Sequence, residues 1–115
     1  MKSYYLCLLT FVMAGYWANL YSQAIPGPGD IVITEIMANP DAVSDTNGEW
    51  IEIRNMTGKD LLINGLKLED SGTNMHVLTS AGSLILPANS YWVLGRNGNS
   101  QINGGVNVNY VYQNF

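Results

Sequence analysis

The acidic stretch from Asp41 to Glu49 has side chains that suit a hard cation. Ca²⁺ needs several oxygen ligands, and a short loop rich in Asp, Asn and Gly can supply carboxylates and carbonyls together. The candidate calcium ligands are Asp41, Asp45, Asn47 and Glu49. Calcium is therefore the one cofactor for which the sequence offers a candidate site.

The same loop does not match an EF-hand. Val43 stands at the first ligand position and Arg54 at the closing one, where an EF-hand requires carboxylates. The alternative is a solvated turn in which Asp41, Asp45 and Asn47 accept hydrogen bonds from their own backbone. Of the two interpretations we favour the solvated turn, and no cofactor is then needed.

Paired carboxylates could act as the acid and base of a glycosidase, and Glu49 and Glu52 are the obvious pair. Strand parity places these two side chains on opposite faces, because they are three residues apart. Glu35 lies on another expected strand and could approach Glu49. Over a catalytic pair we nevertheless favour a structural role, in which a partly buried Glu forms hydrogen bonds with loop backbone.

No other catalytic arrangement stands out. His76, the sole histidine, lies on an expected strand and is predicted to be a surface or edge residue. The sequence has no Gly-x-Ser-x-Gly elbow, and the Gly/Asn-rich loop from Gly95 to Gly105 lacks the lysine of a phosphate-binding loop. We therefore expect no enzyme and assign no catalytic residue.

Aromatic residues could form a surface for a carbohydrate or a protein. They are Trp50, Tyr91, Trp92, Tyr110 and Tyr112. Core and cross-strand packing account for most of them equally well, and we favour packing. Tyr91 and Trp92 point to opposite sides of their strand, so at least one of them should be buried if that strand is central.

Composition bounds the remaining possibilities. The chain has 115 residues, 47% hydrophobic and 12% charged, with a net charge of −4 and one cysteine, Cys7. This length supports one domain, and a single cysteine cannot form a disulfide framework. Five basic residues among nine acidic ones make nucleic acid an unfavourable partner.

Residues 1–24 have the features of a secretory signal peptide. Lys2 precedes an apolar stretch, and Ser22-Gln23-Ala24 offers small residues for cleavage before Ile25. Asn19 interrupts the apolar run too early for a membrane-spanning helix. Cleavage leaves four basic residues against nine acidic ones, a net charge of −5, and no cysteine. We expect a secreted or cell-surface protein without a membrane span.

A lead-in of prolines and glycines at residues 25–29 precedes short β-branched and aromatic segments that Gly, Asn, Asp and Pro separate. Such spacing is typical of a β-sandwich, so we expect an all-β fold over residues 30–115. The expected strands are Ile31–Met37, Trp50–Asn55, Leu61–Ile63, Leu66–Leu68, Met75–Thr79, Ser83–Leu86, Tyr91–Gly95 and Val106–Tyr112.

Alternation assigns the faces of the strand at residues 50–55. Ile51 and Ile53 should point into the core, whereas Glu52 and Arg54 should face solvent. Trp50 should partly cover a neighbouring strand. Asn55-Met56-Thr57 is a formal glycosylation sequon, meaningful only in a eukaryotic source.

The block from Asp30 to Arg96 resembles the lamin tail domain family. The matching motifs, in order, are residues 31–40 (IVITEIMANP), 48–55 (GEWIEIRN), 60–68 (DLLINGLKL) and 86–94 (LPANSYWVL). Leu66 stands where that family commonly has Trp. The resemblance implies an immunoglobulin-like β-sandwich of the kind found in nuclear lamins and in many exported bacterial proteins.

This family usually continues through further strands after the one at Tyr91–Gly95. Here residues 106–115 supply only one, so either the last strands are missing or the sequence is the front of a longer protein. The resemblance implies a non-catalytic domain for cell-surface adhesion, scaffolding or protein targeting, with a protein or surface polysaccharide as partner. The alternative is an accessory module of a larger secreted hydrolase or nuclease.

Overall fold

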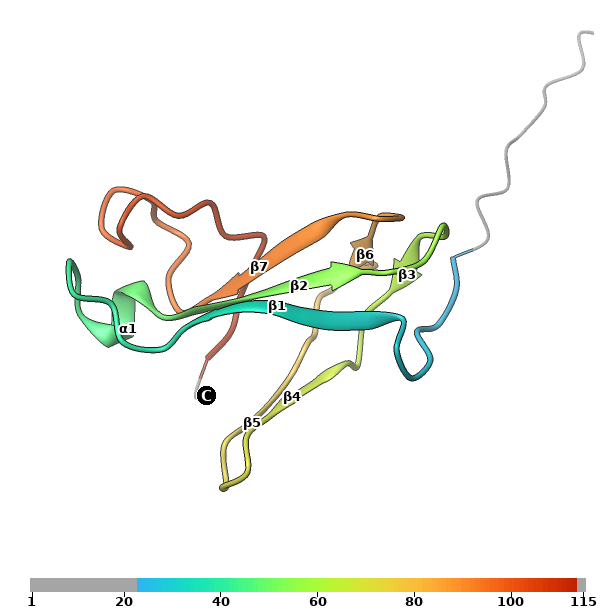
Figure 1. The fold of residues 1–115 in the computed structure, drawn as a ribbon, viewed down its shortest axis with the longest axis horizontal. Coiled ribbons are helices and arrows are strands. Elements are labelled where there is room, and N and C mark those ends of the chain that lie inside the picture. Colours follow the sequence, from blue (N-terminus) through green and yellow to red (C-terminus); the bar gives the residue numbers. More distant parts are fainter. Residues whose placement is uncertain (1–22, 114–115) are drawn as a thin grey trace, which may run out of the picture.

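A computed structural model describes residues 23–113 of the chain. Nearly all regular structure in this range is β (Figure 1). The strands are β1 (Ile31–Met37), β2 (Trp50–Asn55), β3 (Leu61–Leu62), β4 (Lys67–Glu69), β5 (Met75–Val77), β6 (Ile85–Leu86), β7 (Tyr91–Gly95) and β8 (Tyr110–Val111). A single helical turn, α1 (Asp45–Gly48), lies between β1 and β2.

The strands form one large sheet and two small ones. The large sheet has the order β1-β2-β7-β8, in which β8 runs parallel to β7 and the other pairs are antiparallel. The pairs β3-β6 and β4-β5 form two-stranded antiparallel sheets that pack against one face of the large sheet (Figure 1). The predicted all-β class and the immunoglobulin-like sandwich are confirmed.

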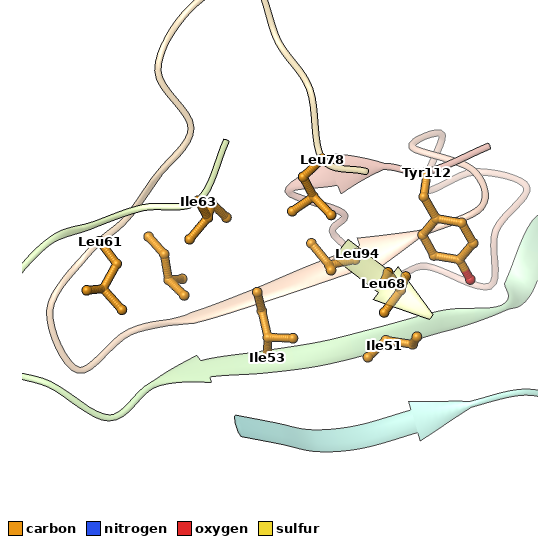
Figure 2. Packing of buried hydrophobic residues seen from close by; sticks show 9 residues of the cluster. Ile51, Ile53, Leu61, Ile63, Leu68, Leu78, Leu94 and Tyr112 are labelled. Atoms are coloured by element: carbon orange, nitrogen blue, oxygen red, sulfur yellow. The ribbon is translucent and has the colours of Figure 1, made fainter. Parts of the chain in front are cut away.

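The core lies between these layers. Ile51 and Ile53 of β2 and Leu94 of β7 point toward the side chains of the small sheets (Figure 2). The remaining members of the buried cluster are Leu61, Ile63, Leu68, Leu78, Leu86 and Tyr112. Burying each such side chain contributes about 1.5–3 kcal/mol, so this cluster is the main source of stability. The predicted inward faces of Ile51 and Ile53 are confirmed.

The outer face of β2 is less open than predicted. Glu52 and Arg54 are both half-buried rather than fully solvated. The Thr34 hydroxyl donates to Glu52 Oε1 at 2.7 Å, and the Arg54 guanidinium lies 5.1 Å from the centre of the Tyr91 ring. Trp50 is also half-buried and lies opposite Met37 of β1, so it covers a neighbouring strand as predicted.

β7 is a central strand, because it lies between β2 and β8. Tyr91 is exposed on it, whereas Trp92 is partly buried and packs against the core cluster. Of the two aromatic residues on this strand, Trp92 therefore faces inward. The prediction that one of them would be buried is fulfilled only in part.

Three strands match their predicted bounds, namely Ile31–Met37, Trp50–Asn55 and Tyr91–Gly95. The predicted strand Leu66–Leu68 begins one residue later, because the Leu66 amide donates to the Ile63 carbonyl in a turn. Gly65 has φ 83° in that turn, a conformation that favours glycine.

β5, β6 and β8 are shorter than predicted where side chains replace backbone partners. In the predicted strand Val106–Tyr112, the Asn109 side chain accepts a hydrogen bond from the Val93 amide, and regular pairing begins only at Tyr110. In the same way, the Leu84 amide donates to Asn64 Oδ1 and the Thr79 amide to the Tyr110 hydroxyl. These amides therefore bond to side chains, which shortens β5 and β6.

Asn55 is a buried polar residue at the end of β2, with 0% of its surface exposed. Its Nδ2 donates to the carbonyls of Lys59, Leu86 and Pro87 at 2.8–3.1 Å. Its Oδ1 accepts from the amide and the hydroxyl of Thr57, both at 2.8 Å. Asn55 therefore fastens two turns to the core, and the sequon that it begins is inaccessible in the folded domain.

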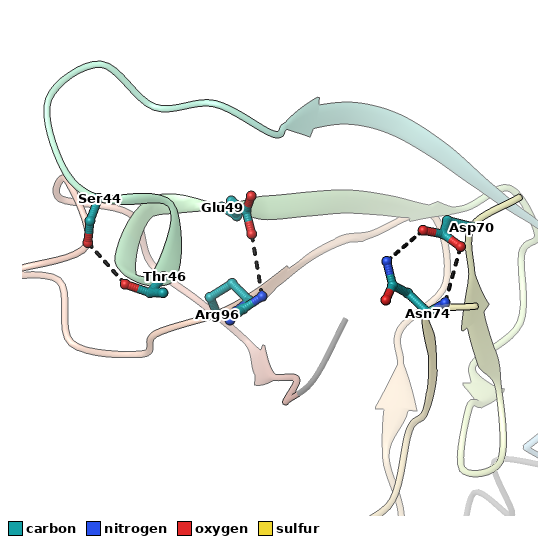
Figure 3. A network of polar contacts seen from close by, with 6 residues as sticks. All are labelled: Ser44, Thr46, Glu49, Asp70, Asn74 and Arg96. Atoms are coloured by element: carbon teal, nitrogen blue, oxygen red, sulfur yellow. Dashed lines mark hydrogen bonds and ion pairs between the residues drawn. The ribbon is translucent and has the colours of Figure 1, made fainter. Parts of the chain in front are cut away.

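The turn between β4 and β5 is organised by Asp70. Its carboxylate accepts a hydrogen bond from the Gly72 amide at 2.7 Å. It also accepts one from the Asn74 side chain at 2.7 Å, which Figure 3 shows. These donors hold the pKa of Asp70 below its ordinary value, the Gly72 amide having the largest effect.

The leader predicted over residues 1–24 falls almost entirely outside the described residues. Ala24, its predicted last residue, forms a parallel bridge with Leu61. In residues 23–113 no helix is long and apolar enough to cross a membrane.

Candidate recognition site

Two loops lie together at one end of the large sheet (Figure 1). The first, residues 38–49, joins β1 to β2 and contains α1, and the second, residues 96–109, follows β7. Both leave the same end, because Met37, Trp50 and Gly95 are neighbours across β1, β2 and β7. We call residues 38–50 and 96–106 the loop end.

Polar contacts join the two loops. Asn97 Nδ2 donates to Asn47 Oδ1 at 2.9 Å. Arg96 and Glu49 form an ion pair at 3.6 Å, shown in Figure 3, in which each side chain is 25% exposed. The Arg96 amide also donates to the Glu49 carbonyl at 3.0 Å. Partial shielding from water makes this ion pair stronger than a fully exposed one.

The second loop is braced from within by Asn103, which is buried. Its Nδ2 donates to the carbonyls of Asn97 and Val106 at 2.8 and 2.9 Å, and its Oδ1 accepts from the Val106 amide at 2.9 Å. A buried amide with all these bonds formed holds a loop in one shape.

The first loop is closed by apolar packing around Gly48. A Cβ built on this residue would clash with Cγ2 of Val43 and would lie 2.8 Å from Cγ of Pro40. Only glycine therefore fits where α1 packs under the loop. At the start of α1, the hydroxyls of Ser44 and Thr46 are 3.1 Å apart (Figure 3).

A cleft of about 440 Å³ lies between the two loops. Its lining includes Asn39, Asp41, Val43, Trp50 and Asn103. Among the residues that line it are one carboxylate, two amides and one indole, and no Lys, Arg or His. This cleft offers hydrogen-bonding groups beside an aromatic surface, a combination typical of ligand sites.

The four predicted calcium ligands are distributed over this end of the domain. Asp41 is exposed and lines the cleft, and Asp45 is exposed at the start of α1. Asn47 bonds to Asn97, which joins the loops instead of closing a turn within the first loop, and Glu49 pairs with Arg96. In residues 23–113 no three His, Cys, Asp or Glu side chains form a group suited to a metal ion.

The structure does not bring Glu49 and Glu52 together. Glu49 pairs with Arg96, whereas Glu52 lies opposite Glu35 across β1 and β2. The expectation that Glu35 could approach Glu49 is therefore wrong. A β-bulge between Ile33 and Glu35 shifts the register, which sets Glu35 against Glu52.

His76 of β5 joins β8 to the β4–β5 sheet. Its Nε2 lies 2.9 Å from the Tyr110 hydroxyl and its Nδ1 lies 3.0 Å from the Gln113 carbonyl. The Tyr110 hydroxyl also accepts from the Thr79 amide at 3.0 Å. His76 is half-buried. Because the Gln113 carbonyl can only accept, Nδ1 donates to it, and these bonds give His76 a structural role.

Tyr112 lies next to the ion pair of the loop end. Burial raises the pKa of its phenol above the ordinary value, the Glu49 carboxylate raises it further, and Arg96 opposes them.

The sequence analysis did not predict the contacts that Asn47, Asn97 and Asn103 make. The density of Asn between Gly95 and Gly105 is the signal that could have indicated them.

The sequence model described as Lamin Tail Domain matches residues 25–114. No curated protein and no solved structure matches this chain.

Proposed function

This chain belongs to the lamin tail domain family, and we propose that it is a non-catalytic, exported domain that binds a partner at its loop end. Such binding would serve adhesion or scaffolding at a cell surface. The observation that carries the proposal is the cleft of about 440 Å³ between two loops that are fixed to each other.

Because the two loops are fixed to each other, the cleft between them is a preformed binding site. Asn97 and Asn47, together with Arg96 and Glu49, join the loops before any ligand arrives. Little conformational entropy is then lost when a ligand binds, which favours affinity.

The chemistry of the cleft favours a neutral, hydroxyl-rich ligand, and we propose a surface polysaccharide. Asp41 and Asn39 offer carboxylate and amide groups for hydroxyls, and Trp50 offers an aromatic surface. An anionic ligand would meet Asp41 with no Lys, Arg or His among the residues that line the cleft. A nucleic acid is therefore a poor candidate.

A retention assay tests this proposal. The purified chain is mixed with insoluble cellulose, chitin, starch and peptidoglycan, and the bound fraction is measured over a range of protein concentrations. We expect retention on at least one of them, and Asp41→Ala should weaken it about tenfold, the loss of one or two hydrogen bonds. Tyr91→Ala is the matched control, because Tyr91 is exposed but does not line the cleft.

Three results would contradict the proposal. They are no retention on any of the four polysaccharides, equal weakening by Tyr91→Ala and Asp41→Ala, and release of soluble reducing sugar by the purified chain. The last would show catalysis instead of binding.

A further inference from the structure

The inner face of β1 is apolar and uncovered. Ile33 lies opposite Ile53, and Ile36 lies opposite Ile51, so these β1 side chains share the face that β2 turns to the core. Their partners are buried, yet Ile33 is 55% and Ile36 is 59% exposed. The sandwich is therefore open along β1.

The small sheets do not reach this far. The buried cluster gathers over β2 and β7 (Figure 2), and of β1 only Ile31, at its start, packs against it. A groove of about 200 Å³ separates Ile36 from Asn74 of the β4–β5 turn, and Ile51 and Tyr112 also line it. Room therefore exists beside β1 on the inner side.

β1 is also an edge strand. In the described part of the chain it pairs with β2 alone, at one end of the order β1-β2-β7-β8. An edge strand presents backbone N–H and C=O groups that can pair with an added strand. β1 thus combines a free pairing edge with uncovered isoleucines.

The outer face of the same edge carries two neighbouring carboxylates, with Arg54 further along, opposite Val32. Glu35 and Glu52 lie directly opposite each other, and in residues 23–113 neither belongs to an ion pair. Like charges at such positions repel, and an added cation would relieve this repulsion. Pairing two copies of the chain through β1 would instead bring further carboxylates to the same edge.

We propose that β1 accepts an extended segment of another polypeptide as an added strand. The segment has apolar residues at alternate positions, which face Ile33 and Ile36, and Lys or Arg between them, which face Glu35 and Glu52. The β-bulge between Ile33 and Glu35 keeps Ile33 and Ile36 on one face, and β2 meets them with the regular alternation of Ile53, Glu52 and Ile51. An added strand that alternates in the same way satisfies both faces. This site is separate from the loop end and does not depend on the function proposed there.

A peptide titration tests this proposal. The probe is a fluorescent nine-residue peptide that alternates Lys and Val, and its anisotropy is followed as the purified chain is added. We expect saturable binding that weakens with salt, and Glu35→Lys should reduce the affinity at least tenfold. A peptide with Glu in place of Lys should not bind. Asp41→Ala, at the loop end, should leave the affinity unchanged.

Amide hydrogen exchange locates the bound peptide. Amides of residues 31–37 should become protected in the complex, and those of residues 97–106 should not. Ile33→Ser combined with Ile36→Ser should weaken binding without unfolding, because both side chains are exposed. Equal binding of the Lys and Glu peptides, protection elsewhere, or a concentration-dependent dimer that Glu35→Lys abolishes would overturn the proposal.

Discussion

Ile33 and Ile53 lie opposite each other on β1 and β2, yet Ile53 is 3% exposed and Ile33 is 55% exposed. The two side chains share one face of one sheet. They differ because the small sheets cover β2, whereas of β1 only Ile31 packs against the core cluster. The extent of the second layer, and not the residue type, decides which isoleucine contributes to stability.

This difference predicts unequal costs of truncation. Ile53→Ala should lower the free energy of unfolding by about 2–5 kcal/mol, because it removes buried methyl groups and leaves a cavity. Ile33→Ala should cost less than about 1 kcal/mol. Urea denaturation of both variants checks this, and equal losses would show that β1 is covered in solution.

Asn55→Ala should cost about 2–4 kcal/mol of stability, because it leaves buried carbonyls and the Thr57 amide without their partner. Asn64→Ala is the matched control. That amide also bonds two backbone groups but is exposed, so water can replace it. Thermal unfolding of both variants provides the comparison, and a smaller loss for Asn55→Ala would contradict the role assigned to this residue.

Alanine at Gly48 or Gly95 should destabilise the domain by about 1–3 kcal/mol. At Gly48 the new methyl meets Val43 and Pro40, and at Gly95 it lies 2.7 Å from Cγ2 of Val108. Gly58→Ala is the control, since nothing lies within 4 Å of its Cβ position. That variant should stay within about 0.5 kcal/mol of the parent chain in a denaturation experiment.

Alkaline pH should destabilise the domain through Tyr112. Its pKa is raised above the ordinary value of 10.0 in the folded state, so the folded state holds the phenol proton more tightly than the unfolded state does. The resulting stability is fully present below pH 10 and is lost as pH rises through the raised pKa. Tyr112→Phe should flatten this part of the curve of melting temperature against pH. An unchanged curve would refute the assignment.

Calcium is the remaining question at the loop end. Because Glu49 already pairs with Arg96, we expect millimolar Ca²⁺ to leave the melting temperature unchanged and to release no heat in calorimetry. A binding isotherm that a chelator reverses and Asp45→Ala abolishes would instead show that the acidic loop is a calcium site.

Much of the fold could be predicted from the sequence. Alternation identified Ile51 and Ile53 as core residues, and turn residues bounded β1, β2 and β7. β5, β6 and β8 were predicted too long, because Asn64, Asn109 and Tyr110 bond to backbone across loops. Such contacts depend on the three-dimensional arrangement and leave no periodic signal.

The candidate site was predicted only in part. Asp41 and Trp50 stand out as an acid and an aromatic residue, and both line the cleft. The bond between Asn47 and Asn97 joins residues 50 positions apart, and no local pattern indicates it. The sequence also did not indicate that Ile33 is exposed, because alternation predicts the face of a side chain but not whether another layer covers that face.

Binding at the loop end is the central claim, and a backbone amide NMR titration tests it most directly. A soluble oligosaccharide from the polysaccharide that retains the chain is added in steps. We predict that shift changes concentrate in residues 38–50 and 96–106 and spare β3 and β6. Shift changes centred on the small sheets, or none at saturating oligosaccharide, would contradict the account.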